Sequence, residues 1–229
     1  MAEHRKTTEH YVKVYTVFNR LWHWSQVTLI FLLLFTGLRI AGLHTLIKYP
    51  LAVTLHTFGA LALLTLWLFA VFWLMTTGMW RQFVPTLTGM GQVIQFYAWG
   101  VFKGESHPFR KQFRRRLNPL QAASYAGLKL VLFPGIWITG IIYLAHNFWA
   151  PLDRSALWLT IVANLHLLAA FGIATFVVVH VYMLTIGHGF REHIRPMLTG
   201  FDRVDLTPEE EAYLRQAEPA RLRDSAPHS

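Results

Sequence analysis

Four long apolar stretches constrain the fold of this sequence more than any other feature. They run approximately over residues 21–40, 51–76, 120–144 and 157–186. Each is long enough to cross a bilayer, which takes about 20 helical residues. Only 14% of the residues are charged, whereas soluble domains are usually about 25% charged. The first stretch follows a polar tail and lacks a small-residue cleavage site, so it is expected to be retained. The pattern predicts an all-α membrane protein with four transmembrane helices.

Lysine and arginine are distributed unevenly around these stretches. The tail before Leu21, the loop 78–118 and the tail after the fourth stretch hold seventeen of the 21 basic residues. Because cytoplasmic loops are enriched in Lys and Arg, both termini and this loop are expected to be cytoplasmic. The net charge of +9 then reflects topology and attraction to anionic lipid. It does not indicate binding of nucleic acid.

The chain divides into a predicted transmembrane domain, residues 1–200, and a cytoplasmic tail, residues 201–229. Within the basic loop, residues 83–102 are apolar with scattered polar positions, which predicts an interfacial helix on the membrane surface. Thr207 and Glu210 have the spacing of a capping box, so a short helix should follow and end before Pro219. The last ten residues are expected to be disordered.

The sequence contains no cysteine. It therefore cannot by itself hold an iron–sulfur cluster, a covalently attached c-type haem or a disulfide. It also offers no nucleophile motif, paired carboxylates or phosphate-binding loop. The two outer connections, about residues 41–50 and 145–156, are too short to form a catalytic domain. Any substrate chemistry linked to this chain is expected on a partner protein.

Four of the twelve histidines lie in or at the edge of the apolar stretches: His23, His56, His166 and His180. Fourteen residues separate His166 from His180. On an α-helix they advance about 1,400°, within roughly 40° of four turns, and rise about 21 Å. The two rings therefore project from one face at two depths. A histidine in hydrocarbon needs a partner, because unsatisfied ring nitrogens are costly there.

The predicted topology supplies such partners. The first span runs outward, so His23 lies near the cytoplasmic surface, level with His180. The second span runs inward, so His56 lies in the outer half, level with His166. The pairs His23–His180 and His56–His166 join histidines at similar depth, and two bis-histidine haems stacked across the bilayer fit this arrangement. The many aromatic residues suit burial of a large flat macrocycle.

Two other interpretations of these histidines remain open at this point. A membrane histidine can be a hydrogen-bonded core residue without a ligand. The four could also ligate a transported metal, although such sites usually contain carboxylates and the four stretches contain no Asp or Glu.

Several short motifs resemble those of a known family. RLWHW (Arg20 to Trp24) resembles the entry to the first span of the di-haem membrane cytochrome b subunits. These subunits serve respiratory formate dehydrogenases, nickel–iron hydrogenases and thiosulfate reductases. FTGL after it, His56, the fourteen-residue histidine pair and LNPLQ (Leu117 to Gln121) are similar as well. The resemblance covers roughly residues 10 to 200.

The resemblance implies a bacterial inner-membrane, multi-pass cytochrome with two haems b, one near each face. It implies electron transfer between a periplasmic iron–sulfur or multihaem subunit, with its catalytic subunit, and a quinone near the cytoplasmic haem. Asn118 and His180 match the positions that flank the quinone, and Gln121 belongs to the same motif. Relatives often have Lys after this Gln, whereas Ala122 stands here. The alternative within this class is a stand-alone transmembrane haem reductase.

The roles of a few further residues stay undecided by the sequence. Arg20, three residues before His23, could pair with a haem propionate or simply reach the interface. Lys129 lies about nine residues into the third span and could meet a propionate. His188 and His193 could carry protons to a quinone or be plain surface residues. Pro134-Gly135 predicts a kink.

Overall fold

The computed structural model describes residues 8–105, 108–109, 117–152, 154–185 and 190–223. The chain forms two compact units, and each has a hydrophobic core of its own. The second unit, residues 24–78 and 124–182, contains most of the long helices. The first contains the remainder: residues 1–23, 79–123 and 183–229.

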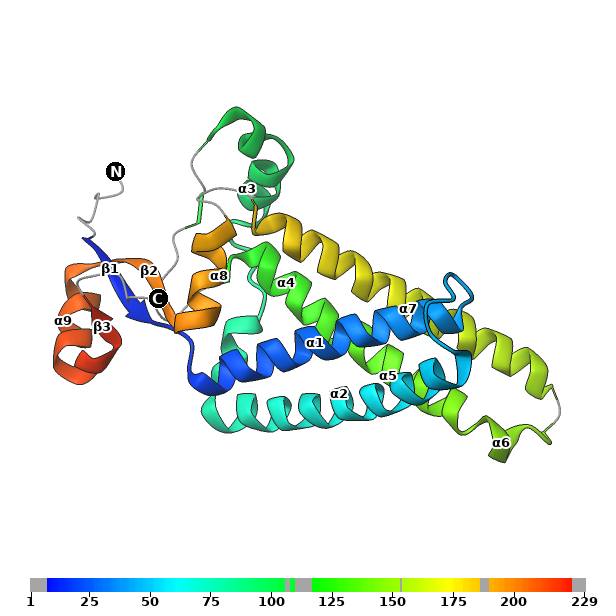
Figure 1. The fold of residues 1–229 in the computed structure, drawn as a ribbon. Coiled ribbons are helices and arrows are strands. Elements are labelled where there is room, and N and C mark those ends of the chain that lie inside the picture. The colour runs from blue at the N-terminus through cyan, green and yellow to red at the C-terminus, as the bar shows by residue number, and fades with distance from the viewer. Residues whose placement is uncertain (1–7, 106–107, 110–116, 153, 186–189, 224–229) are drawn as a thin grey trace. The chain divides into compact units, whose positions relative to one another are not determined.

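Four helical segments are long and apolar enough to cross a membrane, as predicted (Figure 1). They are α1 (Val17–Ile40), α2 (Tyr49–Thr77), the segment Pro119–Leu144 and α7 (Ser155–Met183). Local sequence explains where α2 begins and ends. Pro50 suits the first turn, where its missing N–H leaves no bond unmade, and Gly78 adopts the left-handed conformation that ends helices.

The third of these segments is not a uniform α-helix. It consists of α4 (Pro119–Gly127), a π-helical turn (Leu128–Leu132) and α5 (Phe133–Leu144). Pro134 lies at the start of α5 and cannot donate a backbone hydrogen bond. Its ring also crowds the carbonyl four residues earlier, inside the π-helical turn. The irregularity expected at Pro134 therefore takes the form of a π turn just before it.

The second unit has a core to which all four segments contribute. Leu63 of α2, Leu128 and Trp137 of the third segment, and Ile173 of α7 are buried together, and Leu33 of α1 packs against them. Many other apolar side chains of these helices are exposed, among them Phe58, Phe72, Leu168 and Val178. This outer apolar surface is what a bilayer would cover.

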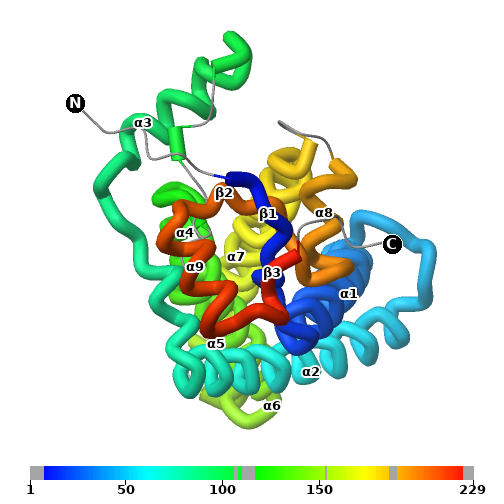
Figure 2. Tube along the Cα trace, turned by 90° about the vertical axis from the view of Figure 1, so that its left-hand side faces the viewer, coloured from blue at the N-terminus to red at the C-terminus, as the bar shows by residue number. Residues whose placement is uncertain are grey.

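The first unit contains a small antiparallel sheet that the all-α expectation did not include. Strand β1 (Thr8–Lys13) lies between β2 (Phe201–Leu206) and β3 (Leu222–Arg223). Figure 2 shows α9 (Pro208–Ala217) beside these strands, and Leu214 of α9 is buried with Val12, Val204 and Leu206. The two tails of the chain are thus folded together because both supply residues to one apolar core.

The C-terminal tail follows its predicted local signals in part. Thr207 and Glu210 form the predicted capping box at the start of α9, which ends before Pro219. Of the last ten residues, 220–223 are folded in a 3-10 turn and β3, and 224–229 lie outside the described residues. Helix α8 (Phe190–Thr199) leads into β2 through Gly200, whose φ of 90° requires glycine.

The segment between α2 and α4 is helical over part of its length. A 3-10 helix (Met79–Phe83) is followed by α3 (Met90–Gln95), a π-helical turn (Phe96–Gly100) and a second 3-10 turn (Val101–Lys103). Of the interfacial helix expected over residues 83–102, the part after Met90 is helical. In the second unit, a short helix, α6 (His146–Trp149), precedes α7.

Candidate cofactor site in the helical bundle

The structure brings together one of the two predicted histidine pairs. His56 lies in the second turn of α2 and His166 in the third turn of α7. Their ring centroids are 6.3 Å apart, and the ring planes are inclined by 65°. The two residues are 110 positions apart in sequence, so only the packing of the helices makes them neighbours.

This separation can be compared with what a shared metal would require. A bond between a metal and an imidazole nitrogen is about 2.0 Å long, and the ring centroid lies about 1.1 Å behind that nitrogen. Two rings on opposite sides of one metal therefore have centroids about 6.2 Å apart. The 6.3 Å between His56 and His166 fits this distance, so these residues suit a bis-histidine iron site.

Each ring of this pair has a threonine hydroxyl on its Nδ1 atom. Oγ1 of Thr36, on α1, is 2.9 Å from Nδ1 of His56. Oγ1 of Thr139, on α5, is 3.1 Å from Nδ1 of His166. Both threonines are buried. The two histidines thus have the same partner type on the same ring atom, supplied by the preceding transmembrane segment.

A glycine follows each of these threonines and makes room for the imidazole. A Cβ atom on Gly37 would lie 3.3 Å from Cε1 of His56, and one on Gly140 would lie 3.2 Å from Cε1 of His166. Such contacts are tighter than almost all real Cβ contacts. Each Thr-Gly dipeptide therefore combines a hydrogen-bonding hydroxyl with a position where no side chain obstructs the imidazole ring.

The second predicted pair is divided between the two units. In the second unit, His180 near the end of α7 has its Nδ1 atom 3.4 Å from the Tyr125 hydroxyl of α4. Phe176 stacks on the His180 ring, with centroids 5.9 Å apart and planes inclined by 6°. In the first unit, His23 lies in the second turn of α1 and is half-buried.

Asn118 and Gln121 bind each other at the start of α4, in the first unit. Gln121 N donates to Asn118 Oδ1 (2.8 Å), and Asn118 N donates to Gln121 Oε1 (3.1 Å). This is a capping box with amide side chains. Asn118 is 2% exposed, and its Nδ2 donates to the Tyr97 hydroxyl (3.2 Å). Burial raises the pKa of Tyr97 above its usual range, so Tyr97 stays neutral at physiological pH.

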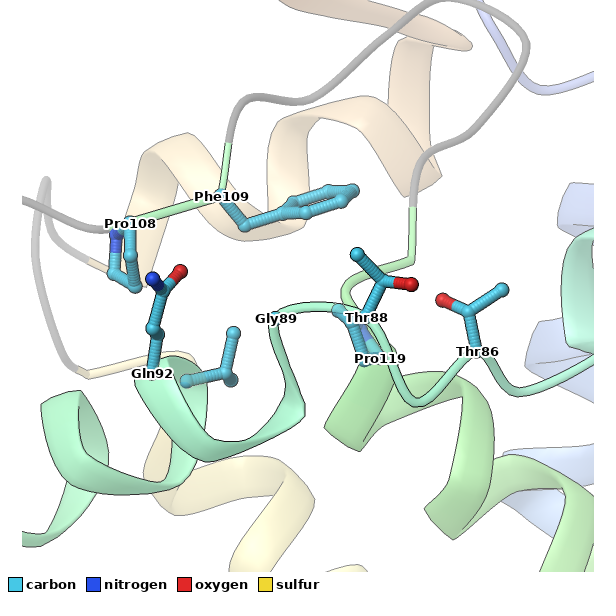
Figure 3. A pocket seen from close by; sticks show the side chains of 8 residues that line it. Thr86, Thr88, Gly89, Gln92, Pro108, Phe109 and Pro119 are labelled. Atoms are coloured by element: carbon cyan, nitrogen blue, oxygen red, sulfur yellow. The ribbon is translucent and has the colours of Figure 1, made fainter.

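A cavity of about 350 Å³ lies beside this capping box (Figure 3). Its size is at the lower end of the range for small-molecule sites. Two threonines and a glutamine provide polar groups, and a phenylalanine and two prolines provide apolar walls. The lining residues are Thr86, Thr88, Gly89, Gln92, Val93, Pro108, Phe109 and Pro119. Pro119 directly follows Asn118, which connects the cavity with the motif expected to bind quinone.

The remaining candidate residues lie as follows. Arg20 donates from Nη1 to the carbonyl oxygen of Leu198, in the last turn of α8, so its side chain stabilises that helix end. Lys129 lies in the π-helical turn, and its Nζ atom is buried. His193 lies on α8. His188 falls outside the described residues.

The sequence analysis gave no role to Thr139, Tyr125 or Tyr97, and Thr36 entered it only as part of the FTGL motif. One signal was available for two of them. Tyr125 and Thr139 are fourteen residues apart on the third span, the same spacing as His166 and His180 on the fourth. In antiparallel neighbouring helices, equal spacings place both pairs in contact, and the structure has both contacts.

Four apolar helical segments, with two half-buried histidines brought together from α2 and α7, are typical of a membrane cytochrome of the b type. Comparison with known families agrees with this class. The chain belongs to the prokaryotic cytochrome b561 family, whose profile matches residues 14–200. It is therefore a haem-binding electron-transfer protein and a multi-pass bacterial membrane protein, and the predicted relationship to cytochrome b subunits of hydrogenases and formate dehydrogenases is confirmed.

One curated relative illustrates the similarity. A putative cytochrome of Escherichia coli (strain K12), YdhU, is 29% identical over 210 residues. The aligned part covers 87% of this chain and 78% of the relative. No solved structure matches the chain significantly. Among the described residues, no group of three or more His, Asp or Glu side chains could hold a metal ion.

Proposed function

We propose that this chain holds two haems b and transfers electrons across the bacterial inner membrane between a periplasmic redox subunit and quinone. His56 and His166 would bind the outer haem, and His23 and His180 the inner one. The observation that carries this proposal is the 6.3 Å separation of the His56 and His166 rings. A separation of this size is what one iron bound by both imidazoles would require.

Helix rise supports similar depths for the two inner histidines. Thr36 and His23 are thirteen residues apart on α1, which corresponds to a rise of about 20 Å. His166 and His180 are fourteen residues apart on α7, a rise of about 21 Å. Thr36 contacts His56, so Thr36 marks the level of the outer pair on α1. His23 and His180 therefore lie about the same distance from that level, each measured along its own helix.

Haem supplies reversible one-electron transfer when it is bound, and the chain's own residues fix its position and surroundings. The four histidines would provide the axial ligands. The apolar helices exclude water from the path between the two sites. Arg20 could offer its remaining guanidinium donors to a propionate. The chain has no cysteine and no catalytic motif, so substrate oxidation or reduction belongs to a partner subunit.

A quinone site near Asn118 and Gln121 completes the proposal. Their amides form the capping box, and they still have hydrogen-bonding capacity that this box does not use. The cavity beside Pro119 provides space of the size of a quinone ring. Basic residues of the same loop favour the cytoplasmic face, where a quinone being reduced would take up protons.

The proposed electron transfer between the inner haem and quinone can be tested with the purified protein. The haems are reduced with dithionite, excess reductant is removed, and a soluble quinone analogue is added while the haem absorption is followed. Rapid reoxidation that is slowed in a variant lacking the inner haem supports the proposal. Equal reoxidation rates with and without the inner haem would place the quinone elsewhere.

The partner is tested separately by mild detergent extraction. Co-purification of a periplasmic iron–sulfur or multihaem protein that reduces the outer haem supports the complex. Full quinone-linked electron transfer by the isolated chain, with no co-purifying redox protein, would favour a stand-alone haem reductase.

A further inference from the structure

Two buried threonines contact the outer histidine pair in the same way. On α1, Thr36 lies beside His56, and on α5, Thr139 lies beside His166. Each threonine hydroxyl is also close to the carbonyl oxygen four residues earlier in its own helix. These distances are 2.8 Å from Thr36 Oγ1 to Leu32 O and 2.7 Å from Thr139 Oγ1 to Gly135 O.

The hydrogen positions follow from these two contacts. A carbonyl oxygen can only accept, and a threonine hydroxyl has one proton. If that proton points to the carbonyl, the hydroxyl oxygen must accept from an N–H at Nδ1 of the histidine. If it pointed to Nδ1 instead, two oxygen atoms would face each other at 2.7–2.8 Å without a proton between them. Only the first arrangement satisfies both contacts.

We propose that Thr36 and Thr139 are positioning residues that keep the proton of His56 and His166 on Nδ1 and so reserve Nε2 for iron. This rests on the proposed function, because it assumes that the two histidines are haem ligands. A ligating imidazole whose other nitrogen donates a hydrogen bond is oriented by it and becomes more basic. Greater basicity stabilises the oxidised iron, so both threonines lower the reduction potential of the outer haem.

The glycines act together with the threonines. A side chain on Gly37 or Gly140 would press on Cε1 of the histidine, the carbon between the two ring nitrogens. With glycine there, the ring can lie close to the neighbouring helix, and Nδ1 comes within hydrogen-bond distance of the hydroxyl. Each Thr-Gly pair therefore fixes both the tautomer and the orientation of one histidine.

The inner site differs in this respect. The Tyr125 hydroxyl is 3.4 Å from Nδ1 of His180, longer than either threonine contact. A tyrosine hydroxyl lies too far from its own backbone to bond the carbonyl four residues back, as the two threonine hydroxyls do. The outer haem should therefore depend on its hydroxyl partners more strongly than the inner haem does.

The proposal is tested by replacing each threonine with valine, which keeps the shape and removes the hydroxyl, and with serine, which keeps the hydroxyl. Potentials of both haems are measured by optical redox titration. At a fixed potential, we expect Thr36→Val and Thr139→Val each to raise the ratio of reduced to oxidised outer haem about tenfold. This corresponds to a positive shift of about 59 mV for one electron. The inner haem and both serine variants should stay near wild type.

Two controls make the effect specific. Thr65→Val removes a hydroxyl that donates to the carbonyl four residues earlier on α2, and it should leave both potentials unchanged. Tyr125→Phe should shift the reduction potential of the inner haem only, and by less than the valine variants shift that of the outer haem. An unchanged outer potential in haem-loaded valine variants, or a serine variant that shifts as much as the valine one, would overturn the proposal.

A second measurement does not depend on the variants. In protein labelled with ¹⁵N-histidine and freed of haem, NMR reports which nitrogen of the unligated ring carries the proton. We expect Nδ1–H at His56 and His166; protons on Nε2 would overturn the tautomer assignment. If a valine variant binds no haem, the serine variant decides. Haem binding in the serine variant supports the proposal, and failure of the serine variant to bind haem refutes the proposal. Haem retention in His56 and His166 variants would instead refute the ligand assignment of the proposed function.

Discussion

The imidazole rings of His56 on α2 and His166 on α7 lie with their centroids 6.3 Å apart and their planes inclined by 65°. Their Nδ1 atoms are both held by threonine hydroxyls, at 2.9 and 3.1 Å. A bilayer interior has no water to satisfy such polar groups, so a buried histidine pair in it needs both a ligand and a hydrogen-bond partner. This combination supports iron ligation more than a role for either histidine as a core hydrogen-bonding residue.

Glycine replacement tests the space around these rings. Gly37→Ala and Gly140→Ala would place a methyl group 3.2–3.3 Å from a histidine carbon, so we expect the ring to tilt and the outer haem to bind less tightly by about tenfold, or roughly 1.4 kcal/mol. Haem loss during gel filtration and the electron paramagnetic resonance spectrum measure the effect. Gly127→Ala is the matched control, because a Cβ there meets nothing within 4 Å. Equal behaviour of the three variants would show that the glycines do not shape the site.

Asn118→Asp separates the helix cap from the quinone site. Aspartate caps a helix as well as asparagine does, so both haems and their reduction by the partner should be retained. Its carboxylate lacks the Nδ2 donor and adds charge, so oxidation of the haems by quinone should slow at least about tenfold, or about 1.4 kcal/mol. Stopped-flow spectroscopy measures this rate.

Tyr97→Phe is the control for that experiment. It removes the same hydrogen bond between Asn118 and Tyr97 but leaves the asparagine amide in place. If quinone contacts the amide, this variant should keep most of its oxidation rate. Slow oxidation in both variants would attribute the effect to the lost contact, and unchanged kinetics in haem-loaded Asn118→Asp would leave Asn118 as a cap.

The orientation of the chain follows from its basic residues. Arg and Lys between residues 109 and 116 should lie in the cytoplasm together with both termini. Trypsin added to intact spheroplasts should therefore leave this segment uncut, whereas lysed cells should show cleavage there. Cleavage in intact spheroplasts would invert the topology and exchange the positions of the two haems.

The folded tails should weaken in acid. Glu211 on α9 accepts from Arg215 (2.9 Å) and from Thr8 on β1 (3.1 Å). The hydrogen bond from Arg215 is the main reason that the pKa of Glu211 lies below its ordinary value of 4.5, and the one from Thr8 adds to it. A lowered pKa in the folded state contributes stability above pH 4.5, and this contribution is lost as pH falls through the folded value.

Amide hydrogen exchange of β1 in detergent, corrected for its intrinsic pH dependence, measures this loss. Protection should decrease as the pH is lowered below 4.5, the ordinary pKa of Glu211. Glu211→Gln keeps an acceptor for Thr8 but does not titrate, so it should show a flatter profile. The same pH profile in both proteins would assign the acid sensitivity to other groups.

The transmembrane part of the fold was predictable because its signals are local. Apolar length marks the four spans, and the fourteen-residue spacing of His166 and His180 sets two depths on one helix. The sheet was not predictable in this way. Strand β1 has only six residues, and its partner β2 begins nearly 190 positions later. Nothing in either tail alone shows that Val12 and Val204 share a core.

The hydroxyl partners of the histidines were missed for a related reason. A threonine that bonds the carbonyl four residues back is common in membrane helices, so Thr36 and Thr139 resemble Thr65 in sequence. Thr36 and Thr139 differ from Thr65 in preceding a glycine, but the helix packing is what shows that a histidine lies beside each of them. The bond between Asn118 and Tyr97 depends on the fold of the loop, so no local signal in the sequence predicts it.

The haem content of the purified chain tests the central claim most directly. Wild-type protein should contain two non-covalently bound haems b per chain, with low-spin spectra. His166→Ala should lose the outer haem and keep at least part of the inner one, and His180→Ala should do the reverse, which the distinct potentials of the two haems would identify. No haem in the wild-type protein, or two haems retained in both variants, would contradict the account.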